Sequence, residues 1–164
     1  MRTHEEQVTR AFEESRGDVY RYLVSLGVSP PQAQEVTQEA FLRLYVALER
    51  GEDVRNLRAW IFRVAHNHAL DVRSKDRLRP IEPELEAMLR DEHVSVETEL
   101  IEKEKMSHLG KAWSGLSPQQ RQCLHLRAEG LLYREIAATM QISISSVREF
   151  LSRAVARLQK AVYE

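Results

Sequence analysis

Hydrophobic residues recur at intervals of three and four along most of this 164-residue chain, and that spacing constrains the fold more than any other feature. It is typical of amphipathic helices that bury one face. Three such stripes occupy the first half of the chain: residues 8–26, 33–48 and 57–72. Gly27 is a typical helix stop, and Ser29 followed by two prolines is a typical helix start. No segment alternates hydrophobic and polar residues between turn signals as a strand would, so we predict an all-α protein.

The helical pattern breaks down where Pro80, Pro83 and a group of acidic residues interrupt it. Prolines and charges without periodicity favour a solvated connector. Helical spacing resumes beyond this segment. We therefore predict two small helical domains, residues 1–75 and 96–164, joined by a flexible acidic linker at 76–95.

The overall composition is that of an ordinary soluble protein, with 43% hydrophobic and 30% charged residues. No apolar run approaches the ~20 residues that a bilayer-spanning helix needs, and the N-terminus lacks the apolar core of a signal peptide. The single cysteine, Cys123, excludes an internal disulfide and a Cys-rich zinc site. We expect a cytoplasmic protein without membrane insertion.

The formal net charge of −1 argues, as a single number, against a nucleic-acid binder. Its distribution argues the opposite. Residues 55–79 carry 7 basic and 2 acidic side chains, and residues 111–164 carry 8 and 4. The other two segments are acidic: residues 1–54 carry 6 basic and 10 acidic side chains, and residues 80–110 carry 3 basic and 9 acidic side chains. Two basic blocks separated by an acidic one indicate two anion-facing surfaces, although charge can also vary this much by chance.

The C-terminal residues have the pattern of a helix-turn-helix. Ser117 and Pro118 open a helix that stops at Gly130, a short helix follows over 133–140, and a long amphipathic helix begins at Ile144 after a three-residue break. In such a unit the second helix enters the major groove of DNA. The alternative is an ordinary helical hairpin with a solvated charged face.

The polar side of that long helix carries side chains suited to reading base edges. Arginine can donate two bonds to guanine, glutamate can accept from cytosine, and serine adapts to either. Ser143 is the natural N-cap of the helix. The candidate DNA-binding residues are Ser143, Ser145, Ser146, Arg148, Glu149, Ser152, Arg153 and Arg157.

This C-terminal stretch resembles region 4 of bacterial sigma factors, specifically of the extracytoplasmic-function (ECF) class. The family pattern has three parts. Residues 116–118 correspond to its Leu-Ser/Pro-Pro entry, residues 130–137 to Gly-Leu-Ser-Tyr-x-Glu-Ile-Ala, and residues 142–148 to Ile-Ser-x-x-Thr-Val-Lys/Arg. Leu132 replaces the serine that would cap the short helix, a loss that costs ~1 kcal/mol. Glu149 replaces a small or basic residue. Output domains of LuxR-type regulators carry a similar pattern, so the N-terminal half of the sequence must distinguish a sigma factor from such a regulator.

Residues 32–45 resemble sigma region 2.2, with Gln38, Glu39, Phe41, Leu42 and Arg43 matching the family motif. In the family this helix docks on the clamp helices of the RNA polymerase β′ subunit. The stripe through Phe41 packs inward. The resemblance therefore implies a polymerase-binding face made of Glu35, Gln38, Glu39, Leu42 and Arg43.

Residues 57–75 resemble sigma regions 2.3 and 2.4, with Trp60, Ile61, Val64, Ala65, Asn67 and Asp71 matching position for position. In the family, this asparagine and the preceding loop, here 49–56, hold a flipped base of the melted −10 element. Trp60 is expected in the core. The implied −10 residues are Arg63, Asn67, Asp71, Arg73, Lys75 and Arg77.

The resemblance implies a sigma initiation factor. It would bind core RNA polymerase (the β′ clamp helices and the β flap), read −35 DNA as duplex and −10 DNA as a melted strand, and answer to an anti-sigma factor. The alternative is a LuxR-type regulator that binds DNA without polymerase. A third possibility is an adaptor that uses the fold only for protein contacts.

No arrangement of residues indicates catalysis or a cofactor. The pairs His66/His68 and Cys123/His125 lack recognised metal-ligand spacing. No glycine-rich phosphate loop, catalytic triad or carboxylate pair is present. We expect a protein that is not an enzyme, with no metal and no cofactor. The free chain should bind promoter DNA weakly, because its acidic segments offset its basic ones.

Overall fold

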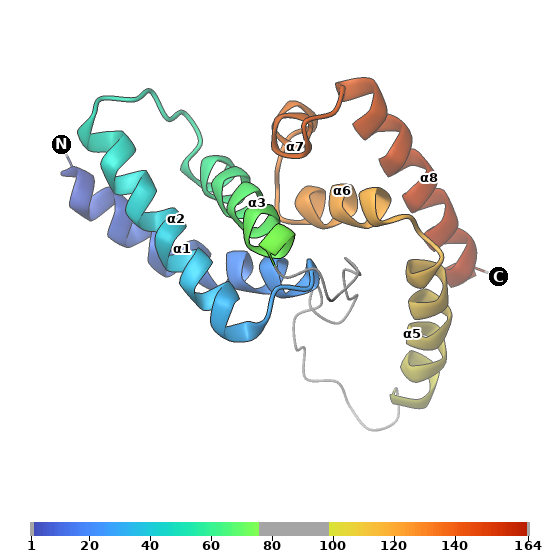
Figure 1. Ribbon diagram of the computed structural model, residues 1–164. Helices are drawn as coiled ribbons and strands as arrows, with labels where there is room; N and C mark the ends of the chain where they lie inside the picture. Colours follow the sequence, from blue (N-terminus) through green and yellow to red (C-terminus); the bar gives the residue numbers. More distant parts are fainter. Residues whose placement is uncertain (1, 76–98, 164) are drawn as a thin grey trace.

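The computed structural model describes residues 2–75 and 99–163, and all regular structure in those ranges is α-helical (Figure 1). The N-terminal helices are α1 (His4–Ser25), α2 (Pro30–Glu49) and α3 (Leu57–Lys75). The C-terminal helices are α5 (Glu99–Ser114), α6 (Pro118–Ala128), α7 (Tyr133–Met140) and α8 (Ile144–Tyr163). The all-α prediction is confirmed. The predicted linker at 76–95 lies outside the described residues.

The helix ends follow local signals in the sequence. The N–H of Gln120 donates to Oγ of Ser117 at 3.1 Å, and the N–H of Ser117 donates to Oε1 of Gln120 at 3.0 Å, which forms a complete capping box. Gly27 follows α1 with φ 87°, a left-handed conformation that glycine adopts freely. Ser29 differs from its predicted role, because its hydroxyl donates to Gln32 at 3.0 Å instead of capping the backbone.

In the N-terminal domain, α1 packs against both α2 and α3. Tyr22 and Leu23 of α1, Leu44 of α2 and Phe62 of α3 are fully buried between them. The buried face of α3 is turned slightly from the predicted stripe, since it runs through Ala59, Phe62, His66 and Ala69 and leaves Trp60 half-buried.

In the C-terminal domain, α5, α6 and α7 all pack against α8. Trp113 and Leu116 meet Ala154 in a small separate core. The hydrophobic spacing of α8 predicts an inner face of Val147, Leu151, Ala154, Val155, Leu158 and Val162. Val147, Leu151 and Ala154 are buried, whereas Val155 and Val162 are exposed.

The two domains are in contact, with α3 beside α7 and the end of α1 beside α6 (Figure 1). One hydrophobic cluster runs through both domains, from Val19 and Phe62 to Leu126 and Ile136. None of the helices that the structure describes combines the length and the apolar character required to cross a bilayer.

Candidate nucleic-acid and polymerase interfaces

A three-residue turn orients α8 relative to α7. Gln141 adopts φ 57° and ψ 47°, a left-handed conformation that is unusual for a residue other than glycine. The N–H of Ser146 donates to Oγ of Ser143 at 3.0 Å, so Ser143 caps α8 as predicted. At the start of α7, the N–H of Leu132 still donates to Oε1 of Glu135 at 2.8 Å. Half of the capping box therefore survives without the serine.

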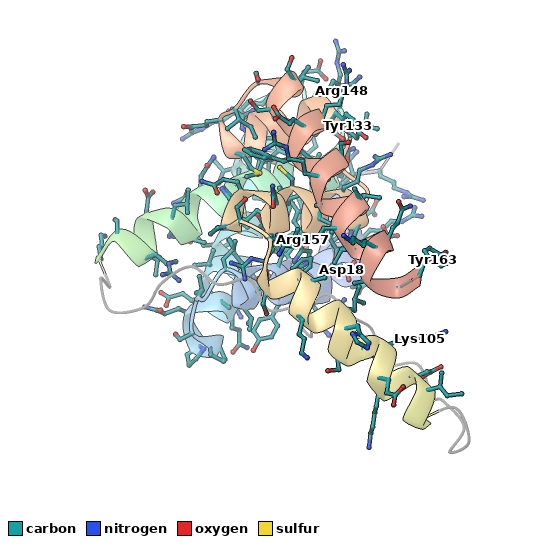
Figure 2. The ribbon with its side chains drawn as sticks, turned by 90° about the vertical axis from the view of Figure 1, so that its right-hand side faces the viewer. Asp18, Lys105, Tyr133, Arg148, Arg157 and Tyr163 are labelled. Carbon is teal, nitrogen blue, oxygen red and sulfur yellow. The ribbon has the colours of Figure 1, made fainter. Side chains whose placement is uncertain are left out.

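The outer face of α8 presents most of the residues predicted to contact −35 DNA. Arg148 extends into solvent near the N-terminal end of the helix (Figure 2). Glu149 and Arg153, one turn apart, form an exposed ion pair of 2.6 Å. Ser145 and Ser152 are exposed beside them, and Ser146 is half-buried.

Arg157 is oriented differently from the other arginines of α8. Its Nη1 donates to the carbonyl oxygen of Gly115 at 2.9 Å. Its guanidinium lies so close to Gly115 that a side chain there would collide with it. Arg157 thus joins α8 to the segment that follows α5.

The −10 residues predicted on α3 share one side of the helix only in part. Arg63, Asn67 and Asp71 follow one another at four-residue spacing, which places them on one face. Arg63 and Asp71 are exposed and Asn67 is half-buried. Lys75 is exposed at the end of the helix, whereas Nη1 of Arg73 donates to the carbonyl oxygen of Leu26 at 2.7 Å. Arg77 lies outside the described residues.

The loop before α3 ends at Asn56, which caps the helix. Oδ1 of Asn56 accepts from the N–H of Ala59 at 3.2 Å. The loop and the first turns of α3 border a hollow of about 570 Å³ whose opposite wall is α7. Its lining includes Asn56, Trp60 and Arg63 from one domain and Glu135 and Thr139 from the other. Asn67 is not among the lining residues.

The predicted polymerase-binding residues form a continuous strip on α2. Glu35, Gln38, Leu42 and Arg43 are exposed, and Glu39 is half-buried beside Arg43 at 3.3 Å. Leu42 keeps 62% of its surface exposed. Tyr45 and Val46 extend the apolar part of the strip. An exposed apolar patch of this kind is typical of a protein-binding surface.

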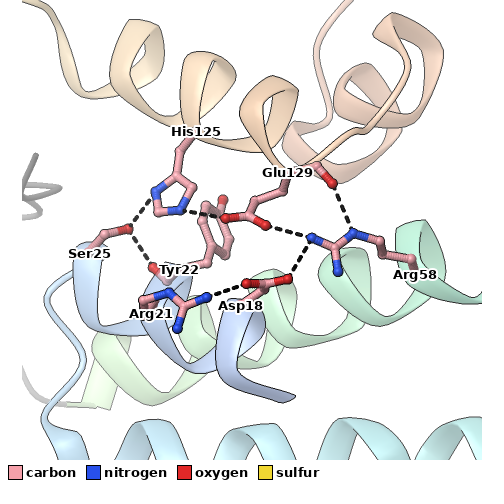
Figure 3. Close-up of polar contacts among 7 residues, drawn as sticks. All are labelled: Asp18, Arg21, Tyr22, Ser25, Arg58, His125 and Glu129. Atoms are coloured by element: carbon pink, nitrogen blue, oxygen red, sulfur yellow. Dashed lines mark hydrogen bonds and ion pairs between the residues drawn. The ribbon is translucent and has the colours of Figure 1, made fainter. Parts of the chain in front are cut away.

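A polar cluster between the domains was not predicted from the sequence (Figure 3). Arg58 of α3 places Nη2 at 2.5 Å from Oε2 of Glu129 and at 3.0 Å from Oδ2 of Asp18. The fully buried ring of His125 places Nδ1 at 3.2 Å from Oγ of Ser25 and meets the ring of Tyr22 edge-on at 5.0 Å. His125 stands between Leu124 and Leu126 in a helix that is otherwise largely polar, so the sequence carried no signal for this cluster.

Three titratable groups inside the protein have shifted pKa values. Burial lowers the pKa of His66 to about 4. Burial raises the pKa of the Cys123 thiol to about 12, so the thiol stays protonated. Burial, with a smaller contribution from Cys123, raises the pKa of Tyr22. All three groups are neutral at pH 7, as expected for a packed core. In the described part of the chain, no three His, Cys, Asp or Glu side chains gather as a metal site would require.

Comparison with known proteins follows the same two-domain division. The family model described as Sigma-70 region 2 matches residues 11–79, and the one described as Sigma-70, region 4 matches residues 109–158. The ECF RNA polymerase sigma factor SigM of Bacillus subtilis is 31% identical over 148 residues, covering 89% of this chain and 88% of SigM.

The chain belongs to the ECF family of RNA polymerase sigma factors. The RNA polymerase sigma-H factor of Pseudomonas aeruginosa is also 31% identical, over 153 residues, covering 80% of this sigma factor and 73% of sigma-H. Among solved structures, the sigma factor RpoE in its co-crystal structure with the anti-sigma factor NepR from Bartonella quintana has a TM-score of 0.57. That alignment has 20% identity and covers 94% of this chain and 95% of RpoE, which supports the fold.

Proposed function

We propose that this sigma factor reads the −35 element of its promoters through the outer face of α8. The exposed row of Ser145, Arg148, Glu149 and Ser152 on a helix held by a helix-turn-helix supports this assignment most directly. The capped N-terminus of α8 suits a DNA phosphate. Arg153 joins the same face through its ion pair with Glu149. Arg157, which bonds to Gly115, would contribute only if that bond opened.

Recognition of the melted −10 strand is assigned to the N-terminal domain, region 2. Arg63, Asn67, Asp71 and Lys75 provide cations and hydrogen-bonding groups along α3, and the loop 49–56 adds Asn56 at its end. Single-strand recognition needs a basic track together with groups that can hold an unstacked base. A flipped base is available only in opened DNA, so binding it stabilises the melted promoter. Melting therefore requires no catalytic residue. We accordingly infer that the protein is not an enzyme.

The strip on α2 is assigned to core RNA polymerase, with Leu42 as its apolar centre and Glu35, Gln38 and Arg43 around it. Region 4 would contact the β flap. The domain limits proposed are 1–75, 76–95 and 96–164. The acidic linker would follow the RNA exit path, where its charge imitates that of nucleic acid.

An anti-sigma factor is the expected regulator, since RpoE from Bartonella quintana was crystallised with the anti-sigma factor NepR. Such a partner would compete for the α2 strip or for the DNA-reading faces. A cytoplasmic location follows from the same assignment, because core polymerase and promoter DNA lie there.

Run-off transcription tests the assignment. Purified chain is added to core RNA polymerase on a library of genomic promoters, and transcripts are sequenced. The expected result is initiation at a small set of promoters that depends on both components. DNA binding by the chain alone, with no polymerase-dependent transcript, would instead favour the regulator that acts without polymerase.

A further inference from the structure

We propose that the hollow between the start of α3 and the start of α7 is a binding site for a nucleoside polyphosphate, with Trp60 against the base and with Arg63 and Arg134 on the phosphates. The inference goes beyond the proposed function, because it concerns a free nucleotide and needs neither promoter DNA nor RNA polymerase. It also gives a role to a feature that promoter recognition leaves unexplained, the leucine that replaces serine at the start of α7.

The hollow has the size and the position of a small-molecule site. Its volume of about 570 Å³ lies within the roughly 300–1,000 Å³ of such sites, which occur preferentially at domain interfaces. One wall comes from the loop before α3 and the first turns of α3. The other wall comes from α7, which packs beside α3 (Figure 1). A ligand bound here would therefore contact both domains at once.

One part of the lining suits a flat aromatic ring. Trp60 is half-buried and Leu132 keeps 43% of its surface exposed, although both are large apolar side chains. Val54 and Ala138 add smaller apolar groups from the two walls. A ring that stacks on the indole and covers Leu132 would remove apolar surface from water. A nucleobase meets this requirement, because every base has a flat π face.

Two arginines on opposite walls of the hollow lack a counter-charge. Arg63 of α3 and Arg134 of α7 are exposed, and both line the hollow. Among the residues that the structure describes, no carboxylate lies within ion-pair distance of either guanidinium. The carboxylate of Asp53, in the same lining, is offset by Arg55 at 3.6 Å. Guanidinium groups bind phosphate oxygens through paired, charge-assisted hydrogen bonds, so these two arginines suit a chain of phosphates.

The first turn of α7 gives the phosphates a second group of donors. Leu132 occupies the N-cap position and offers the backbone no side-chain acceptor, so this turn lacks the hydroxyl that caps other helices. Leu132, Arg134 and Glu135 all line the hollow, which places the turn at its wall. Uncapped N–H groups at the positive end of a helix bind phosphate. The carboxylate of Glu135 is held by its neighbours, since it accepts from the N–H of Leu132 at 2.8 Å and from Nδ2 of Asn56 at 3.0 Å.

Binding of ATP to the full chain, without DNA or polymerase, tests the site by calorimetry and by tryptophan fluorescence. The chain has two tryptophans, and Trp113 is only 2% exposed, so quenching by a stacked base reports on Trp60. We expect ATP to quench this emission. ATP should also bind more tightly than adenosine or inorganic triphosphate, because each of these makes only part of the contacts. Trp60→Phe keeps a ring in the hollow, so it should still bind ATP but lose the quenching.

Substitutions on the two walls test the phosphate contacts. Arg63→Ala and Arg134→Ala should each weaken ATP binding about tenfold, the size of one charge-assisted contact. Lys103→Ala, at an exposed position of α5, makes the same change in net charge and should leave the affinity unchanged. Leu132→Ser restores an acceptor for the first turn of α7, so it should weaken the binding of inorganic triphosphate. Circular dichroism verifies that each variant retains its helices.

Unchanged ATP affinity in Arg134→Ala would overturn the site, and so would an equal loss in Arg134→Ala and Lys103→Ala, which indicates attraction by net charge alone. ATP binding that leaves Trp60 unquenched would overturn the placement of the base. A fluorescein-labelled DNA single strand of random sequence separates a free nucleotide from promoter DNA, because its affinity should not depend on Arg134. A loss of strand binding in Arg134→Ala as large as the loss of ATP binding would assign the hollow to the −10 strand instead. If Arg134→Ala loses its helices, ATP binding is judged on Arg63→Ala.

Discussion

The hydroxyl of Tyr22 and Nδ1 of His66 lie 2.7 Å apart inside the N-terminal domain, where α1 meets α3. Both side chains are almost fully buried, and their rings are stacked at 6.0 Å. The contact pairs the two polar groups inside the protein. It does not provide a counter-charge, so an imidazolium at this position would be poorly solvated.

This environment predicts that stability falls in mild acid. Burial lowers the pKa of His66 from 6.5 to about 4, so the unfolded chain binds a proton more readily than the folded one. The stabilisation is fully present above pH 6.5 and is lost as the pH falls from there through about 4. Between pH 7 and pH 5 the free energy of unfolding should fall by about 2 kcal/mol from this group.

Urea unfolding at the two pH values measures the effect. His66→Gln should be less stable at pH 7 but should lose about 2 kcal/mol less than wild type on acidification. His108→Gln, at an exposed position of α5, is the control and should behave like wild type. Equal pH dependence in wild type and His66→Gln would contradict the assignment of the transition to His66.

The division of labour between the domains predicts a selective defect in Asn67→Ala. Open-complex formation should fall about tenfold, the value of one hydrogen bond to a base, whereas binding to −35 duplex should stay unchanged. Permanganate reactivity of the melted strand and duplex gel shifts measure the two steps in the holoenzyme. Thr9→Ala, exposed on α1, serves as the control. An equal loss in both assays would refute the separate roles.

The turn between α7 and α8 predicts a stabilising glycine. A left-handed residue other than glycine carries a strain of about 1 kcal/mol, and Gln141 has φ 57°. Gln141→Gly should raise the free energy of unfolding by about 0.5 kcal/mol, after the greater freedom of glycine in the unfolded chain is subtracted. Gln159→Gly, exposed within α8, should lower it by about 1 kcal/mol. Thermal unfolding of the two variants distinguishes these opposite signs.

The strip on α2 predicts a variant that loses polymerase binding without losing stability. Leu42 is 62% exposed and Ile101 of α5 is 61% exposed, so the two residues form a matched pair. Leu42→Ala should weaken the affinity for core RNA polymerase about tenfold, as expected for a central apolar contact. Ile101→Ala should leave that affinity unchanged. Similar affinities for the two variants would place the polymerase contact elsewhere.

Much of the fold could be predicted from the sequence because its signals are local. Ser117, Gly27 and Gly130 delimit helices through contacts within a few residues. The spacing of hydrophobic residues indicated which positions of α2 are buried, and in α8 it did so for the first half of the helix but not for Val155 and Val162, which are exposed. The exposed α8 face with Arg148 and the α2 strip with Leu42 follow from the same periodicity, because what faces away from the core is free to meet a partner.

The contact between the domains could not be predicted in this way. Arg58 and Glu129 are 71 positions apart, and Ser25 and His125 are 100 apart. Each of these residues is polar and could equally well lie on a solvated surface. Their burial depends on where the second domain packs, which hydrophobic periodicity within one helix does not specify. Only three-dimensional structure brings them together.

The two arginines at opposite ends of the α8 face provide the sharpest test of its role. Arg148 is exposed, whereas Arg157 bonds to the carbonyl oxygen of Gly115 at 2.9 Å. Arg148→Ala should weaken binding to −35 duplex by about 1–3 kcal/mol, the value of one arginine contact to a base, and leave thermal stability unchanged. Arg157→Ala should lower the free energy of unfolding by about 0.5 kcal/mol, because an exposed hydrogen bond is lost and water replaces the donor. Gel shifts and thermal melts on both variants separate these roles. If Arg157→Ala impairs DNA binding as strongly as Arg148→Ala while the melting temperature stays fixed, then Arg157 leaves Gly115 to contact DNA, and the DNA-binding face extends to the end of the helix.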